Sequence, residues 1–108
     1  MENFNEAIAG RTPVLVDFYA VWCGPCKAMR PIVDELDRNF KGKAKVLTVN
    51  IDDIANRRLV ALYNIRSVPT LIIFRDGVQH WRRSGVVDYE ILKKELEKYI
   101  EMVEPEMA

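Results

Sequence analysis

The sequence is short of the groups that several other functions require. It has two cysteines and a single histidine, His80, too few of these residue types for the four ligands of a structural zinc site. Its 16 basic and 16 acidic residues cancel, which leaves no overall positive field to hold a nucleic acid. No apolar run is long enough to cross a bilayer. These absences argue against a metal site, a nucleic-acid partner and a membrane protein.

The N-terminus also lacks the pattern of a secretory signal. Residues 1–6 are acidic and polar, whereas a signal peptide has a basic start followed by an apolar stretch. We therefore expect a cytoplasmic protein. In a reducing compartment, a lone pair of cysteines is more often redox-active or metal-binding than a structural bridge.

The periodicity of the apolar residues predicts an α/β fold. A length of 108 residues suits one domain, residues 1–108, with 103–108 as a flexible tail. Alternating strands and helices imply parallel strand pairs, and Asp76 and Gly77 predict a closing hairpin. We expect a mixed central sheet with helices on both faces, in which segments 14–20 and 45–51 are both central strands. The expected elements are helix 2–9, strand 14–20, helix 26–40, strand 45–51, helix 54–63, strand 70–74, strand 78–84 and a helix from about Asp88.

The two cysteines stand where a predicted strand meets a predicted helix. Free backbone N–H groups and the positive end of the helix dipole would stabilise a thiolate at Cys23. Such a thiolate attacks a disulfide sulfur, and Cys26, one helical turn on, can resolve the mixed disulfide. Gly24 leaves little bulk between the sulfurs, and Pro25 fixes the backbone at the helix start. Covalent haem is excluded, because Lys27 stands where that motif needs a histidine.

Asp17 interrupts an otherwise apolar strand. A charged and unpaired carboxylate is costly to bury, so we expect its pKa to be raised. Close to Cys26, such a group could accept the proton of that thiol when the mixed disulfide is resolved. The alternative is that Asp17 lies exposed on a strand edge.

Two longer segments carry a resemblance to a known family. Residues 16–27, VDFYAVWCGPCK, resemble the active-site signature of thioredoxins, and residues 65–70, IRSVPT, resemble the segment that this family carries opposite its cysteines. Asp76 and Gly77 match the family's hairpin turn, and residues 84–86 match its third substrate-contacting loop. The likeness extends over nearly the whole chain, and it implies the three-layer thioredoxin-like fold.

The resemblance also implies a function. Cys23 would be the nucleophile, Cys26 the resolving cysteine and partner in a redox disulfide, and Asp17 the buried proton acceptor. The chain would be a monomeric protein-disulfide reductase that acts in cell redox homeostasis. It would bind no cofactor and would receive electrons from NADPH through a thioredoxin reductase, with protein disulfides as substrates. A non-catalytic binding or chaperone module of the same fold is the alternative. The groove for the substrate strand would be lined by Trp22, Gly24, Pro25, Val68, a cis Pro69, Gly85 and Val86.

The chain departs from the family pattern at three places. Thr48 stands where many bacterial members have a lysine near the buried aspartate, so we expect different electrostatic tuning of Asp17. Tyr19 stands where a tryptophan is common. The first edge strand is expected to be shortened or absent. Five arginines outside these motifs could form a basic face for a partner, but we interpret them as solvated surface residues, given the 16 acidic residues elsewhere: Arg57, Arg58, Arg75, Arg82 and Arg83.

Overall fold

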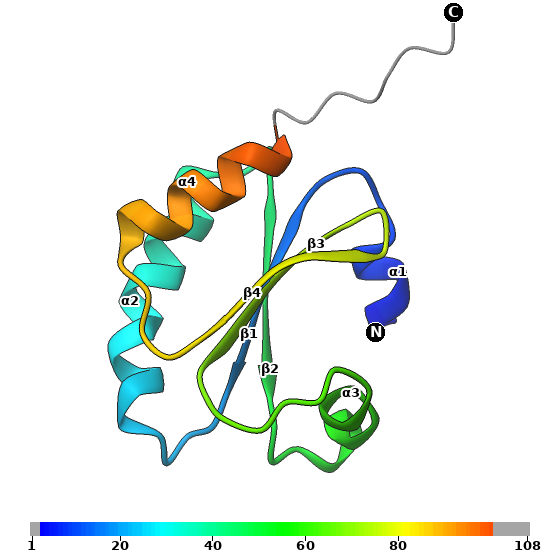
Figure 1. Ribbon diagram of the computed structural model, residues 1–108, viewed down its shortest axis with the longest axis vertical. Coiled ribbons are helices and arrows are strands. Elements are labelled where there is room, and N and C mark those ends of the chain that lie inside the picture. Colours follow the sequence, from blue (N-terminus) through cyan, green and yellow to red (C-terminus); the bar gives the residue numbers. More distant parts are fainter. Residues whose placement is uncertain (1–2, 101–108) are drawn as a thin grey trace, which may run out of the picture.

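The computed structural model describes residues 3–100, in which helices and strands follow one another nearly as predicted (Figure 1). The predicted tail at 103–108 lies outside the described residues. None of the described helices is long and apolar enough to span a membrane. The elements are α1 Phe4–Ile8, β1 Val14–Tyr19, α2 Gly24–Asn39, β2 Lys45–Asn50, a 3-10 turn at Ile54–Asn56, α3 Arg57–Leu62, β3 Thr70–Arg75, β4 Val78–Ser84 and α4 Tyr89–Ile100.

The strands form a mixed sheet in the order β2-β1-β3-β4. β1 pairs parallel with β2 and antiparallel with β3, so that Asp17 lies between Thr48 and Leu71. β3 and β4 form the predicted antiparallel hairpin. The predicted mixed sheet is confirmed.

The prediction that residues 45–51 form a central strand is wrong. Within residues 3–100, no strand lies beyond β2, which is therefore an edge strand whose side chains are mostly exposed or half-buried. The apolar pattern of β2 resembles that of a covered strand, but a sequence pattern does not report whether a further strand pairs with it. The first edge strand of the family pattern is absent from the described residues, as predicted.

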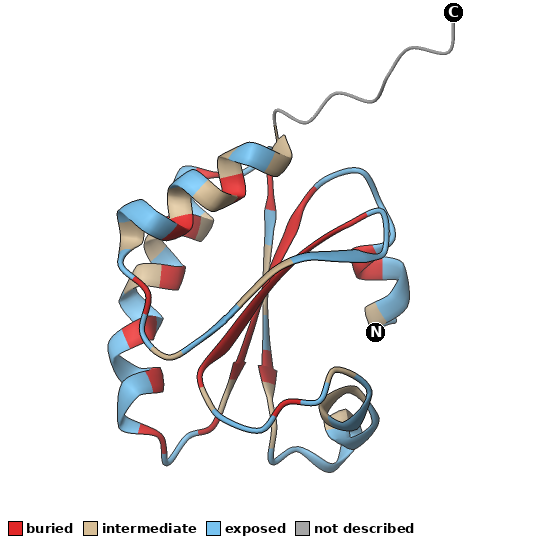
Figure 2. Cartoon of the chain, viewed as in Figure 1, coloured by how far each residue is buried: buried red, intermediate tan, exposed pale blue. Residues whose placement is uncertain are grey.

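Two apolar cores lie on opposite faces of the sheet. Figure 1 shows α2 and α4 on one side of the strands and α1 and α3 on the other. Successive residues of a strand point to opposite faces, so Leu15 packs in the core under α2 and α4, whereas Val14 and Val16 pack in the other core. Burial of each such side chain contributes about 1.5–3 kcal/mol. Figure 2 shows the buried residues concentrated along the central strands, which makes β1 a rigid base for the loop that follows it.

Two helices differ from their predicted form, one in its first residue and the other in its continuity. α2 begins at Gly24 rather than residue 26, because Cys23 caps it. The predicted helix 54–63 is divided into the 3-10 turn and α3, with Asp53 capping the turn through the N–H of Ala55 at 2.9 Å. Neither piece has a fully buried residue, so little packing energy is available to hold a continuous α-helix.

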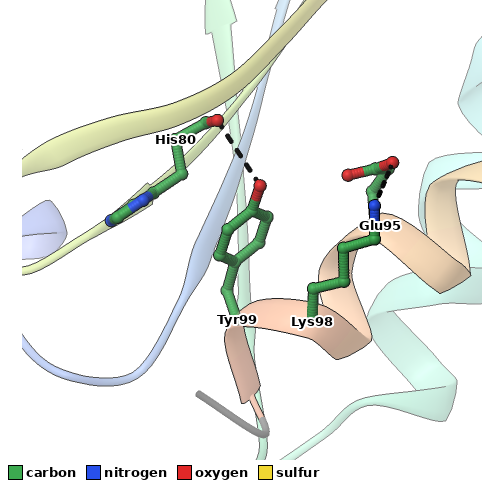
Figure 3. A network of polar contacts seen from close by, with 4 residues as sticks. All are labelled: His80, Glu95, Lys98 and Tyr99. Atoms are coloured by element: carbon green, nitrogen blue, oxygen red, sulfur yellow. Dashed lines mark hydrogen bonds and ion pairs between the residues drawn. The ribbon is translucent and has the colours of Figure 1, made fainter. Parts of the chain in front are cut away.

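The C-terminal end of α4 packs against β4 through Tyr99 and His80. The ring of Tyr99 lies 5.0 Å from that of His80, and its hydroxyl donates to the His80 carbonyl at 3.4 Å (Figure 3). The nearby pair of Lys98 and Glu95, 2.9 Å apart, is exposed and contributes little to stability. Trp81 is half-buried against the core under α4.

Two of the five arginines are not the solvated residues that we predicted. Arg75 is 5% exposed and its Nε donates to the carbonyl of Arg11 at 2.9 Å. Arg82 donates to the carbonyls of Tyr63 and Asn64 at the end of α3. Both guanidinium groups therefore connect loops to the sheet, because they donate hydrogen bonds to carbonyl groups that have no partner within a strand or helix.

Candidate active site

The two cysteines lie at the junction between β1 and α2. Cys23 has extended backbone angles and is the N-cap of α2, and its Sγ accepts a hydrogen bond from the N–H of Cys26 at 3.1 Å. Pro25 lies in the first turn, where a missing N–H is harmless. Cys23 and Cys26 form a disulfide with Cα atoms 5.2 Å apart. The structure therefore represents the oxidised state, with a sulfur held against the positive end of a helix.

The loop before β3 faces the disulfide. The peptide bond between Val68 and Pro69 is cis, as the family resemblance implied. The carbonyl oxygen of Val68 lies 3.6 Å from Cys23 Sγ. In the disulfide this sulfur has no proton to donate, so the pair is a contact; in the reduced state the thiol could donate to the carbonyl. Segments 45 residues apart in the chain are thus brought together at the reactive atoms.

The loop after β4 joins the same region. The N–H of Gly85 donates to the carbonyl of Pro69 at 2.9 Å, and Gly85 has a φ of +91°. Val86, the next residue, is 49% exposed, and Val68 is half-buried. The structure therefore places Val68, Pro69 and Gly85 side by side, whereas the contact of Val86 with a substrate stays a prediction.

The φ of Gly85 yields a prediction about stability. Gly85→Ala should destabilise the protein by about 1 kcal/mol, because a Cβ at positive φ is strained even though the space around it is open. Gly24→Ala is the matched control, since Gly24 lies in the first turn of α2 with open space and no positive φ, and should be neutral or slightly stabilising. Urea unfolding of both oxidised variants measures the difference. Equal stability of the two variants would contradict this account of Gly85.

Trp22 is the largest exposed apolar residue beside the cysteines. Its side chain is 67% exposed, and its indole Nε1 donates to Asp52 at 2.7 Å. This bond holds the ring between the loop after β1 and the loop after β2. Sequence reasoning missed Asp52 as a site residue, because 30 residues separate the two partners and no local pattern links them. Gly24 and Pro25 are exposed between the cysteines.

Asp17 is buried rather than exposed on a strand edge, so the alternative interpretation is wrong. It is 1% exposed, and its Oδ1 has no hydrogen-bond partner among the described residues. Burial raises the pKa of Asp17 from the usual 3.8 to about 6, the charge of Arg30 opposes that rise, and the charge of Asp34 adds to it. A carboxyl group with this pKa can change protonation near neutral pH.

A cavity of about 320 Å³ joins Asp17 to Cys26. Both residues line it, and its exposed lining residues bring it to the surface. The proposed proton acceptor and the thiol that it would serve therefore share one space. Arg30 was missed by the sequence analysis, although its position one helical turn after Cys26 was a usable signal. The lining residues are Asp17, Tyr19, Ala20, Val21, Cys26, Lys27 and Arg30.

Comparison with known proteins agrees with this geometry. The family model described as Thioredoxin matches residues 1–100. A thioredoxin from Rickettsia felis is 46% identical over 82 residues, which is 76% of each chain. Thioredoxin 1 from Nostoc sp. is 43% identical over 96 residues, which is 89% of this chain and 88% of the relative. A solved thioredoxin variant from Halobacterium salinarum NRC-1 superposes with a TM-score of 0.81 at 37% identity, covering 93% of this chain and 85% of that one. The chain belongs to the thioredoxin family.

Proposed function

We infer that the chain is a protein-disulfide reductase in which Cys23 attacks the substrate and Cys26 completes the exchange. The observation that carries this inference is the Cys23–Cys26 disulfide at the start of α2, facing the cis peptide bond before Pro69. Membership of the thioredoxin family supports the same activity.

The reaction transfers two electrons from the dithiol to the substrate. The Cys23 thiolate attacks one sulfur of a substrate disulfide; a bond forms between Cys23 and that sulfur, and the other substrate sulfur leaves as a thiolate and takes up a proton. Cys26 then loses its proton and attacks Cys23 Sγ. The Cys23–Cys26 disulfide forms, and the substrate's second sulfur leaves as a thiolate.

The local structure supports these two roles. The hydrogen bond from the Cys26 N–H to Cys23 Sγ, together with the helix N-terminus, favours negative charge on Cys23. Cys26 shares its cavity with Asp17. We propose that Asp17 accepts the proton of the Cys26 thiol when the mixed disulfide is resolved, since the pKa of Asp17, raised by burial to about 6, lies near working pH.

We propose that the surface around Cys23 binds the substrate as an extended peptide. We propose that the substrate strand pairs with the backbone at Val68, whose carbonyl faces Cys23 at 3.6 Å. Backbone pairing is tolerant of sequence, which suits a general reductase. The residues proposed to line this groove are Trp22, Gly24, Pro25, Val68, Pro69, Gly85 and Val86.

Turnover needs a source of two electrons for the oxidised chain. We propose that NADPH supplies them through a thioredoxin reductase, with no cofactor bound to the chain itself. We also propose that the chain acts as a monomer in the cytoplasm. A reducing cytoplasm would keep Cys23 and Cys26 in the dithiol form that attacks substrates.

A non-catalytic module of the same fold is the second candidate. Binding alone needs neither a cysteine pair nor a buried carboxyl that shares a cavity with one of them, so the geometry favours the reductase.

An insulin-reduction assay tests the proposed function. In the presence of dithiothreitol, the wild-type chain should accelerate the precipitation of the insulin B chain well above the rate with dithiothreitol alone. The control is the same chain after reduction and alkylation of both cysteines, which should give no acceleration. If the untreated chain fails to accelerate precipitation, or if the alkylated chain works equally well, the reductase function is wrong and the binding module is favoured.

A further inference from the structure

The cavity behind Cys26 opens to the surface beside two basic side chains. Its lining includes the buried Asp17 and Cys26 and the exposed Lys27 and Arg30. A proton passed from Cys26 to Asp17 must later reach solvent, and this cavity is a route of suitable size from the pair to the surface. The charges along the route therefore affect how easily the proton leaves.

Arg30 is held in place at this opening. Its guanidinium lies over the ring of Tyr19, 5.1 Å from the ring centre, so a cation–π contact keeps the group on the cavity side of α2. Tyr19 and Arg30 line the same cavity from β1 and α2, respectively. An exposed arginine without such a contact would sample many positions, whereas this contact favours those that place the charge near the route.

The other groups around Asp17 do not supply an equivalent charge. Thr48, its partner on β2, is uncharged and exposed, and Leu71, its partner on β3, is apolar. On α2, Asp34 acts in the opposite direction from Arg30: the charge of Arg30 lowers the pKa of Asp17, and that of Asp34 raises it. Lys27 also lines the cavity, one residue after Cys26, but the positive charge that acts on the pKa of Asp17 is that of Arg30 and not that of Lys27. Arg30 is thus the cation that both lines the cavity and lowers the pKa of the buried carboxyl.

We propose that Arg30 is a positioning residue of the exchange reaction: stacked on Tyr19 at the cavity opening, it places a positive charge beside the route between solvent and the Asp17–Cys26 pair. This inference rests on the proposed role of Asp17 as proton acceptor. Arg30 favours the carboxylate form of Asp17 and so keeps the acceptor ready at neutral pH.

The test compares Arg30→Gln with Arg30→Lys and with Arg38→Gln. Arg38 is an exposed arginine two turns further along α2, and it does not line the cavity. The titration of the Asp17 carboxyl is followed by carbon NMR in the oxidised protein. In Arg30→Gln its midpoint should rise by roughly 0.3–1 in pH, a moderate shift because the guanidinium is exposed and screened. Arg30→Lys should restore most of the wild-type midpoint, and Arg38→Gln should leave it unchanged.

A second readout separates a role in the reaction from a purely structural one. In single-turnover experiments with insulin, the pH dependence of mixed-disulfide resolution should move upward in Arg30→Gln by the same amount as the Asp17 midpoint. An unchanged midpoint in Arg30→Gln, an equal shift in Arg38→Gln, or a shifted midpoint without a shifted resolution profile would each overturn the inference. Failure of the proposed function would look different, because the wild-type chain itself would then not reduce insulin.

Discussion

Replacing Cys26 by serine should stop the reaction halfway and trap the substrate. Cys23 keeps its position at the N-cap of α2, facing Val68, so the reduced variant should still attack a disulfide. The resulting mixed disulfide has no thiol to resolve it and should accumulate. Intact-mass spectrometry after mixing reduced Cys26→Ser with insulin should show a covalent adduct, and catalytic turnover should fall to the rate with dithiothreitol alone.

Cys23→Ser is the matched variant, and it should form little adduct. Exposure does not separate the two cysteines, since Cys23 is 4% and Cys26 is 5% exposed. Their surroundings do: Cys23 Sγ lies against the N–H of Cys26 and the carbonyl of Val68, whereas Cys26 lines the cavity with Asp17. An adduct with Cys23→Ser but not with Cys26→Ser would reverse the two roles, and no adduct with either variant would contradict the proposed chemistry.

Replacing Asp17 by alanine should stabilise the oxidised protein at neutral pH. The carboxyl is 1% exposed with an unpartnered Oδ1, and burial raises its pKa from 3.8 to about 6. An acid whose pKa is higher in the folded state destabilises the fold once the unfolded chain ionises. Where the carboxyl is ionised in both the folded and the unfolded state, the difference between its two pKa values corresponds to a loss of roughly 3 kcal/mol in the free energy of unfolding. Because the smaller side chain also leaves a void, we expect a net gain of about 1–3 kcal/mol.

The gain from Asp17→Ala should depend on pH in a defined direction. Below about pH 4 the carboxyl is protonated in both the folded and unfolded states, so the ionisation penalty is absent. The penalty grows between about pH 4 and pH 6 and is fully present above that range. Urea unfolding of the oxidised wild-type protein and variant at about pH 3 and at pH 7.5 compares the stability difference without and with this penalty. Asp17→Asn should show the same pH trend, and a loss of stability in both variants at pH 7.5 would mean that Asp17 is part of a hydrogen-bonded structure.

Much of the site could be predicted because its signals are local. Cys23, Gly24, Pro25 and Cys26 are consecutive, and Asp17 was identified by a charge inside an apolar strand. Continuous apolar runs likewise predicted β1 and β3, whose side chains are buried on both faces. Each of these inferences needed only a short window of sequence.

The features that escaped prediction depend on contacts between distant segments. Asp52 reaches Trp22 across 30 residues, and Arg82 reaches Tyr63 across 19. The edge position of β2 depends on whether another strand pairs with it, which its own residues do not encode. Arg30 is intermediate: its spacing from Cys26 is local, but its function depends on Tyr19, a residue of β1.

The pairing register of β1 decides on which face of the sheet the Asp17 side chain lies, so the position of this carboxyl depends on the number of residues in β1. Asp17 lies opposite Thr48 and Leu71 and points to the α2 face because side chains alternate along the strand. One residue inserted within β1 before Asp17 would turn this carboxyl toward the core under α1 and α3, and an apolar neighbour would take its place beside Cys26. The same insertion in a surface loop would be absorbed without moving it. Loops away from the cysteines can therefore change in length during evolution, whereas a residue inserted in β1 would remove the Asp17 carboxyl from beside Cys26.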